Sequence, residues 1–345
     1  GLYNDQHVNH SYSFPTNIEI GNEPDNDDSD GPTSISYTQW QSEYDTLSND
    51  FRSQINSSIL STGPSSSGCC TFPNSFSTDP TYTGSLKPTI GFVTVHTYPL
   101  GGASGYSSVA AGVSALLSSG NDSAYQTFYN KFNDNASNTG YNIRIEETNS
   151  AYQGGSTVAF QETYAAALWA MDYFCYMAYS TNMEGMNLHN GPIGSNSYNA
   201  ISPVGAASSY TLLGPGYGLW AFHYGSQGQP LKTTLSNPGN ANVSAYGLLE
   251  TNGGETLHVI NKTYGSGATN VTATITPGGA YTHAQVIVLQ QANNDVTATT
   301  GITFGGASMG TDGTWTGSYG QQQNLTNGTF TFTLPAAQAA IVHFF

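Results

Sequence analysis

Two acidic segments of the sequence carry the residues best suited to chemistry. The first is the segment NIEIGNEPD, which begins at Asn17. Apolar and polar residues alternate in its first half, which predicts a short strand, and Pro24 ends that strand because proline cannot donate to a ladder. Asn22 and Glu23 would then lie at the carboxyl end of a strand, where α/β barrels place their catalytic groups. The alternative is a strand-end carboxylate that caps the next loop.

The second segment, ETNSAYQGG, begins at Glu147 and follows a predicted strand over residues 141–147. Glu146 and Glu147 are neighbours, and successive side chains of a strand project to opposite faces. Strand parity alone therefore does not say which of the two faces a cleft. The residue on the other face is expected to form a structural hydrogen bond or ion pair, for example with Arg144.

Both segments resemble motifs of known enzymes. The segment IGNEP that ends at Pro24 resembles the fourth-strand motif of retaining glycosidases with a (β/α)8 barrel. The segment at Glu147 resembles the seventh-strand nucleophile segment of glycoside hydrolase family 79, the heparanase and β-glucuronidase family, and this match selects Glu147 over Glu146. The motifs occur in the family's order, with VHTY from Val95 between them. The resemblance covers residues 17–223.

The resemblance implies a retaining glycoside hydrolase that releases terminal β-linked glucuronic acid or 4-O-methylglucuronic acid from glycans. Glu23 would be the general acid/base and Glu147 the nucleophile, with carboxyl groups about 5–5.5 Å apart, because a retaining enzyme protonates the leaving oxygen with one carboxyl and attacks the anomeric carbon with the other. Forming the glycosyl-enzyme would neutralise Glu147 and lower the pKa of Glu23, which turns it into a base.

Three further residues receive roles in substrate binding from the resemblance. Asn22 would hold the sugar 2-hydroxyl, Tyr98 would donate a hydrogen bond towards the nucleophile, and His96 would line the cleft. Aromatic packing at the end of a strand is the alternative for His96 and Tyr98.

The family holds a uronic acid carboxylate largely with neutral donors, namely tyrosine hydroxyls and backbone N–H groups. Tyr152, Gly154 and Gly155 match that segment, although Gln153 stands where a glycine is common. Tyr198 is a candidate for a further donor. The two glycines also suit the turn between a strand and its helix.

A barrel followed by a second domain must position these groups. We expect residues 1–225 to be the C-terminal portion of a (β/α)8 TIM barrel, from about its fourth strand onward, and residues 226–345 to be an antiparallel β-sandwich. The first three strand–helix units would then be absent or would belong to another chain. The family resemblance favours an N-terminal fragment that completes the barrel, since some heparanase-like proteins are processed into two pieces. We expect the chain not to be stable alone.

Periodicity predicts the individual elements of both parts. After the first strand, the barrel strands are predicted at residues 56–61, 90–96, 141–147 and 185–188. The helices are predicted at residues 36–53, 107–117, 123–133, 158–179 and 210–224, with a long loop over 63–76. The sandwich strands are predicted at residues 255–261, 271–275, 284–289, 329–334 and 340–344.

Composition limits the possible partners. Charged residues make up 8% of the chain, and 6 Lys and Arg against 22 Asp and Glu give a formal net charge of −16. Nucleic acids and long sulfated polyanions need clustered cations, which the sequence lacks, so a neutral glycan with one terminal uronic acid fits better. The sequence has no apolar run of transmembrane length and no metal-binding spacing, and we expect neither a metal nor a cofactor.

The polar, sequon-rich composition is typical of a secreted eukaryotic glycoprotein, and we expect a fungal source. The candidate glycosylation sites are Asn9, Asn56, Asn121, Asn135, Asn242, Asn261, Asn270, Asn324 and Asn327. Of the three cysteines, Cys175 is expected to be a packed core thiol, and Cys69 or Cys70 to bond elsewhere, since adjacent cysteines pair only with strain.

Two other functions are compatible with these residues. One is a retaining glycosidase of the same clan with another sugar, such as a xylosidase. The other is a non-catalytic glycan-binding or structural surface glycoprotein built on a decayed barrel, although both glutamates are in place.

Overall fold

The structure is a computed structural model. It describes residues 17–26, 34–152, 159–180, 182–190, 198–203, 209–237 and 239–345, with only the backbone of residues 134, 135 and 137. The chain forms two compact units. The sheet unit comprises Gly1–Thr97, Gln126–Thr148 and Ser180–Leu188, and the sandwich unit comprises Tyr98–Tyr125, Asn149–Tyr179 and His189–Phe345. This division differs from the predicted boundary after residue 225, because residues 98–125, 149–179 and 189–225 group with the sandwich strands.

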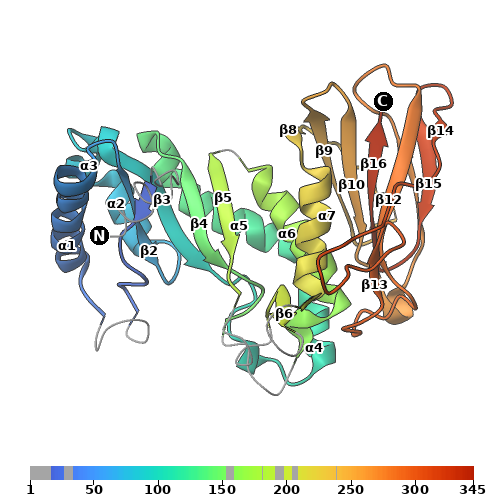
Figure 1. The fold of residues 1–345 in the computed structure, drawn as a ribbon, viewed down its shortest axis with the longest axis horizontal. Helices are drawn as coiled ribbons and strands as arrows, with labels where there is room; N and C mark the ends of the chain where they lie inside the picture. The colour runs from blue at the N-terminus through green and yellow to red at the C-terminus, as the bar shows by residue number, and fades with distance from the viewer. Residues whose placement is uncertain are drawn as a thin grey trace. The chain divides into compact units, whose positions relative to one another are not determined.

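The sheet unit is built on five parallel strands (Figure 1). They are β1 (Asn17–Glu19), β2 (Leu60–Ser66), β3 (Ile90–Thr97), β4 (Ile143–Thr148) and β5 (Met183–Leu188). Their order in the sheet is their order in the chain, and every pairing is parallel, as in one arc of a (β/α)8 barrel. The described residues thus form five of the eight strands of the predicted barrel.

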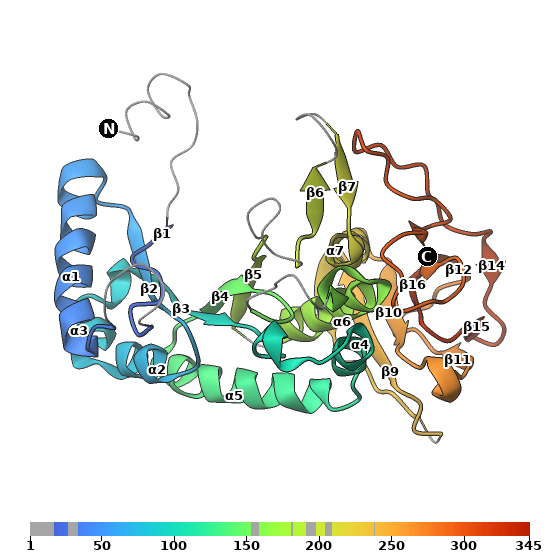
Figure 2. The same ribbon diagram turned by 90° about the horizontal axis from the view of Figure 1, so that it is seen from below.

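Helices cover one face of this sheet (Figure 2). They are α1 (Tyr37–Asp50), which continues into a π-helical turn over Phe51–Ile55, α2 (Thr71–Thr78), α3 (Pro80–Thr83) and α5 (Asn121–Thr139). α1 begins at Ser36, whose side chain accepts from the N–H of Gln39 in a capping box. Its Trp40 and Tyr44 rings are buried, and a Cβ added to Gly63 of β2 would lie 3.0 Å from Trp40, so the glycine permits this close packing.

The sandwich unit contains the antiparallel strands. They are β8 (Gly228–Leu231), β9 (Val243–Glu250), β10 (Glu255–Asn261), β11 (Val271–Ile275), β12 (His283–Gln291), β13 (Ile302–Phe304), β14 (Gln323–Asn324), β15 (Phe330–Leu334) and β16 (Gln338–Phe344). The large sheet has the order β13-β12-β16-β10-β9-β8, with β14 on β12, and β11 pairs with β15 in the second layer. The five predicted sandwich strands are confirmed.

Helices pack on the other face of the large sheet. They are α6 (Tyr164–Ala178) and α7 (Gly214–Gly225), and the unit also holds α4 (Val109–Leu116) and the hairpin of β6 (Ile201–Pro203) and β7 (Tyr210–Leu212). α6 is buried on nearly all sides, as its composition predicts. Its Asp172 accepts hydrogen bonds from Tyr246 of β9 and from Lys262, which follows β10.

Several predicted element boundaries are wrong, among them those near residues 61, 164 and 210. The run STGPSS, which the sequence suggested is mostly loop, belongs to β2, and α2 begins at Thr71 inside the predicted loop. Pro64 fits this central strand because the β2–β3 register shifts on both sides of Gly63. Near residue 210 the chain first forms β7, and α7 begins only at Gly214.

The expectation for the adjacent cysteines is also wrong. Cys69 and Cys70 are bonded to each other, across a cis peptide bond directly before α2. Cys175 is free and buried in α6, as predicted.

The candidate glycosylation sites differ in how exposed their asparagine side chains are. Asn121 and Asn261 are buried and their amide groups donate to backbone carbonyls, so these two predictions do not suit the folded chain. Asn270, Asn324 and Asn327 are exposed. Asn9, and the side chain of Asn135, lie outside the part that the structure describes. None of the described helices has both the length and the apolarity that a bilayer span requires.

Candidate active site

Glu23 follows β1 in a left-handed backbone conformation. Its φ is 45°, and Gly21 before it has a φ of 99°. The Glu23 N–H donates to the carbonyl oxygen of Ser65 at 2.8 Å, which ties the turn to the end of β2. Asn26 donates from Nδ2 to Glu23 Oε2 at 2.9 Å. A non-glycine residue in this conformation costs about 1–3 kcal/mol, and such strain clusters at functional sites.

A β-bulge places Glu147 at the end of β4. The register of β3 with β4 shifts just before His96, which lies opposite Glu147, so Glu146 is the extra residue. Glu146 forms the predicted ion pair, with 3.1 Å between Arg144 Nε and its Oε1, and also accepts from Asn187. The bulge explains why strand parity did not decide between the two glutamates.

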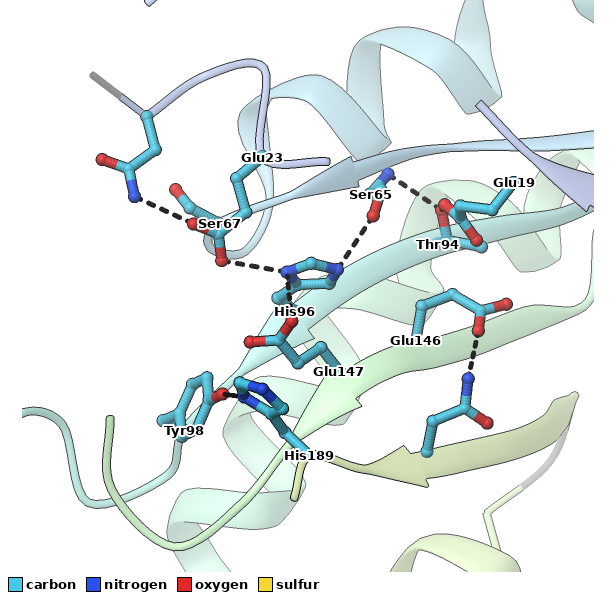
Figure 3. Close-up of polar contacts among 12 residues, drawn as sticks. Glu19, Glu23, Ser65, Ser67, Thr94, His96, Tyr98, Glu146, Glu147 and His189 are labelled. Atoms are coloured by element: carbon cyan, nitrogen blue, oxygen red, sulfur yellow. Dashed lines mark hydrogen bonds and ion pairs between the residues drawn. The ribbon is translucent and has the colours of Figure 1, made fainter. Parts of the chain in front are cut away.

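His96 lies between the two glutamates (Figure 3). Its Nδ1 is 2.9 Å from Glu23 Oε1 and 3.7 Å from Glu147 Oε2, and its Nε2 is 2.8 Å from Ser65 Oγ. Nδ1 and one oxygen of each glutamate all lie within 4.8 Å of one another. His96 is only 3% exposed, whereas Glu23 is 16% and Glu147 26% exposed, so the carboxyl groups remain open to a ligand.

The hydrogen bond from His96 lowers the pKa of Glu23. Burial and the negative charge of Glu147 act in the opposite direction, and the bond from Asn26 acts with His96. Glu23 is therefore ionised in the unliganded protein. A role as general acid requires that a bound substrate change this balance.

A further carboxyl, that of Glu19 on β1, takes part in an adjoining hydrogen-bond network. It accepts from Thr94 Oγ1 at 2.6 Å and from Thr62 Oγ1 at 3.1 Å. Burial, with a smaller contribution from Glu146, raises the pKa of Glu19 to about 7. No role for Glu19 was predicted from the sequence, in which it is one polar residue of the alternating strand segment.

Histidine and carboxylate oxygens are also ligands that divalent cations use. The three groups around His96 Nδ1 are close enough for that. Two carboxyl groups at this spacing also suit the acid/base and nucleophile of a glycosidase.

The other predicted binding residues belong to the sandwich unit. The Tyr98 hydroxyl lies 2.7 Å from His189 Nδ1, and the Tyr198 hydroxyl lies 3.3 Å from the same atom. The ring centroids of Tyr98 and Tyr152 are 6.0 Å apart. These three tyrosines thus form one cluster with His189, which sequence reasoning missed.

The structure says little about the other residues predicted to bind substrate, which are Asn22, Gly154 and Gly155. Asn22 precedes Glu23 and is exposed. Gly154 and Gly155 lie outside the described residues. The available signal for His189 was its position directly after the strand predicted over residues 185–188.

Comparison with known proteins gives a family match within the sandwich unit. Residues 245–341 match the family described as glycosyl hydrolase family 79 C-terminal beta domain. This match bears out the predicted resemblance to glycoside hydrolase family 79. The match covers strands β10 to β15 and most of β9 and β16, so the sandwich is the family 79 β domain. A comparison with curated proteins found no match.

Solved glycosidase structures share the fold. A 4-O-α-L-rhamnosyl-β-D-glucuronidase from Fusarium oxysporum 12S is similar with a TM-score of 0.69 and 19% identity, over 95% of this chain and 70% of that one. A family 51 arabinofuranosidase from Xanthomonas axonopodis pv. citri gives 0.68 and 11%, over 100% and 69%. The family 44 endoglucanase Cel44A from Clostridium thermocellum gives 0.63 and 12%, over 96% and 66%. The chain therefore spans about two thirds of the length of these structures.

Proposed function

We propose that the protein is a retaining glycosidase that removes terminal β-linked glucuronic acid or 4-O-methylglucuronic acid from glycans. One observation carries the proposal: a carboxylate oxygen of Glu23, at the end of β1, lies within 4.8 Å of one of Glu147, at the end of β4. A retaining enzyme needs carboxyl groups about 5–5.5 Å apart, whereas an inverting enzyme needs about 6.5–9.5 Å to admit a water molecule.

In the first step of the proposed reaction, Glu147 attacks the anomeric carbon while Glu23 gives its proton to the leaving oxygen. Because Glu23 is ionised in the unliganded protein, it must take up a proton when substrate binds. A sugar over the site would exclude water from a carboxyl that is already partly buried, and this raises its pKa.

In the second step, a water molecule attacks the glycosyl-enzyme and Glu23 accepts its proton. Glu147 is then esterified and uncharged. Because its charge raises the pKa of Glu23 in the free protein, its loss lowers that pKa and favours the basic form. The same pair of residues thus accounts for both steps.

Recognition of the uronic acid is assigned to the cluster of Tyr98, Tyr152, Tyr198 and His189. Hydroxyl groups and an imidazole are donors to a carboxylate, and such neutral donors suit a chain with a formal net charge of −16. The Fusarium enzyme of similar fold is a glucuronidase by name. Asn22 is assigned to the sugar 2-hydroxyl, a bond that strengthens in the transition state.

The proposal is tested with an aryl β-glucuronide and the purified full-length protein. Release of glucuronic acid is expected, and Glu147→Ala should abolish it. Glu146→Gln is the matched control, since it removes the neighbouring carboxyl and should leave most of the activity. Full activity in Glu147→Ala would overturn the assignment.

A panel of other aryl glycosides separates the alternatives. Cleavage of a xyloside or an arabinofuranoside in preference to the glucuronide would favour another sugar, which the shared fold with a family 51 arabinofuranosidase allows. Binding of glycans without any hydrolysis would favour the non-catalytic alternative. An N-terminal fragment that completes the barrel, secretion, glycosylation and a fungal source stay predictions.

A further inference from the structure

Ser65, the penultimate residue of β2, contacts the site through three separate groups. Its N–H donates to Thr94 Oγ1 at 2.9 Å, its carbonyl accepts from the Glu23 N–H at 2.8 Å, and its hydroxyl lies 2.8 Å from His96 Nε2. The side chain is only 2% exposed, so water cannot readily replace any of these partners. Its φ of 54° is left-handed, a conformation that serine rarely adopts.

The surroundings of His96 decide where its ring proton lies. Nδ1 faces two carboxylates, Glu23 at 2.9 Å and Glu147 at 3.7 Å, and a carboxylate without a proton can only accept. A neutral imidazole must therefore carry its proton on Nδ1, which leaves Nε2 as an acceptor. The only role then open to the Ser65 hydroxyl is that of donor.

We propose that Ser65 is a positioning residue of this site, whose hydroxyl donates to His96 Nε2 and so holds the ring with its Nδ1–H directed at Glu23. Its backbone groups are bonded elsewhere, so the hydroxyl is left for the ring. The bonds of the Ser65 N–H and carbonyl also hold the left-handed backbone that directs the hydroxyl at His96.

The hydrogen bond from Ser65 to His96 also affects the pKa of Glu23. A hydroxyl that donates to Nε2 draws electron density from the ring and makes Nδ1–H a stronger donor, since linked hydrogen bonds polarise one another. The hydrogen bond from His96 is the main cause of the lowered pKa of Glu23. By strengthening that bond, the Ser65 hydroxyl also contributes to the lowered pKa. The titratable groups around the pair are Glu147 and, through Thr94, Glu19.

Two variants separate the hydroxyl of Ser65 from its backbone. Ser65→Ala removes the hydroxyl and keeps a side chain at positive φ, whereas Ser65→Gly removes the hydroxyl and relieves the backbone. Ser66→Ala is the matched control, because the Ser66 hydroxyl is also buried but donates to the Gly68 carbonyl at 3.0 Å.

The first readout is the ¹⁵N spectrum of labelled histidine, which distinguishes the two imidazole tautomers, with His96 assigned by the signals lost in His96→Gln. The expected result is an Nδ1–H ring in every protein, because Glu23 and Glu147 stay in place. The Nε2 resonance should be that of a hydrogen-bonded acceptor in the unaltered protein and in Ser66→Ala, and should move to the position of an acceptor without a hydrogen bond in both Ser65 variants. An unmoved Nε2 resonance in both Ser65 variants would overturn the proposal. A change in Ser65→Ala alone would assign the effect to the backbone and also overturn it.

The second readout rests on the proposed function. The basic limb of the kcat/KM profile for an aryl β-glucuronide reports loss of the proton from the general acid. It should move to higher pH by about half a unit in both Ser65 variants and stay in place in Ser66→Ala. An unmoved basic limb together with a shifted Nε2 resonance would contradict the link between Ser65 and the pKa of Glu23. Absence of any hydrolysis by the unaltered protein would sink the proposed function, while the ¹⁵N spectrum would still decide the role of Ser65.

Discussion

The Glu23 N–H donates to the carbonyl oxygen of Ser65, and both residues have a left-handed backbone, with φ values of 45° and 54°. Two strained residues at the ends of neighbouring parallel strands thus hold each other through one 2.8 Å bond. Strain of about 1–3 kcal/mol at each residue persists only where the surroundings fix it. Here the surroundings are His96, Thr94 and Asn26, and the result is a carboxyl group with a defined position.

Replacement of the acid/base carboxyl should separate the two reaction steps. Glu23→Ala is expected to lower kcat/KM by about 10²–10⁴-fold for substrates with poor leaving groups, because such a leaving oxygen needs a proton. Aryl glucuronides with good leaving groups should lose less in the first step. Added azide should restore turnover and give a β-glucuronyl azide, since this anion attacks the glycosyl-enzyme without a base. Equal losses for all leaving groups, without azide rescue, would refute the role of Glu23.

Glu19 should make the sheet unit less stable as the pH rises. Its pKa in the folded chain is about 7, above the value of about 4.3 in an unfolded chain. The folded state therefore binds the proton more tightly, and stability is lost between about pH 4.5 and 7. Glu19→Gln should flatten this slope and raise stability at pH 8 by about 2 kcal/mol, measured by urea unfolding with hydrogen exchange in β1 and β3. A steeper slope in the variant would contradict the assignment.

His258 should have the opposite effect on the sandwich unit. Burial lowers its pKa to about 4, below the value of about 6.5 in an unfolded chain. The unfolded state then binds the proton more tightly, so stability is lost as the pH falls from about 6.5 to 4, by about 3 kcal/mol in full. Replacement of His258 by Leu should remove this dependence in hydrogen exchange of β10. Persistence of the acid-side loss in that variant would show that other groups cause it.

The buried ion pair of Lys262 and Asp172 provides a further test of the sandwich unit. Each side chain is 2% exposed, and Lys262 Nζ lies 2.6 Å from Asp172 Oδ2. Lys262→Met should destabilise the unit by about 3–5 kcal/mol, because Asp172 is left buried and uncompensated. The double variant Lys262→Met with Asp172→Asn should recover part of that loss in chemical unfolding. A double variant less stable than the single one would contradict this account.

The sequence predicted the parts of the site that lie within continuous motifs. Glu23, Glu147, His96 and Tyr98 each stand at the end of a strand that alternation or β-rich composition made visible. The sandwich strands were predicted for the same reason. The ion pair of Glu146 also followed from its position beside Arg144.

The parts that depend on pairing between distant segments were not predictable in this way. Serine and glycine disfavour strands, so the run around Ser65 suggested a loop, yet its neighbours on both sides make it a central strand. The bulge that leaves Glu146 as the extra residue arises from the register of β4 with β3. His189 could be recognised only from the structure, in which the hydroxyls of Tyr98 and Tyr198 both contact its Nδ1.

Covalent trapping tests the central claim most directly. The full-length protein would be incubated with a 2-deoxy-2-fluoro-β-D-glucuronyl fluoride, which forms the glycosyl-enzyme but slows its hydrolysis, and the labelled peptide would be located by mass spectrometry. The account predicts one sugar per chain, attached to Glu147, and no label in Glu147→Ala. A label on another residue, or no label on a protein that hydrolyses aryl β-glucuronides, would contradict it.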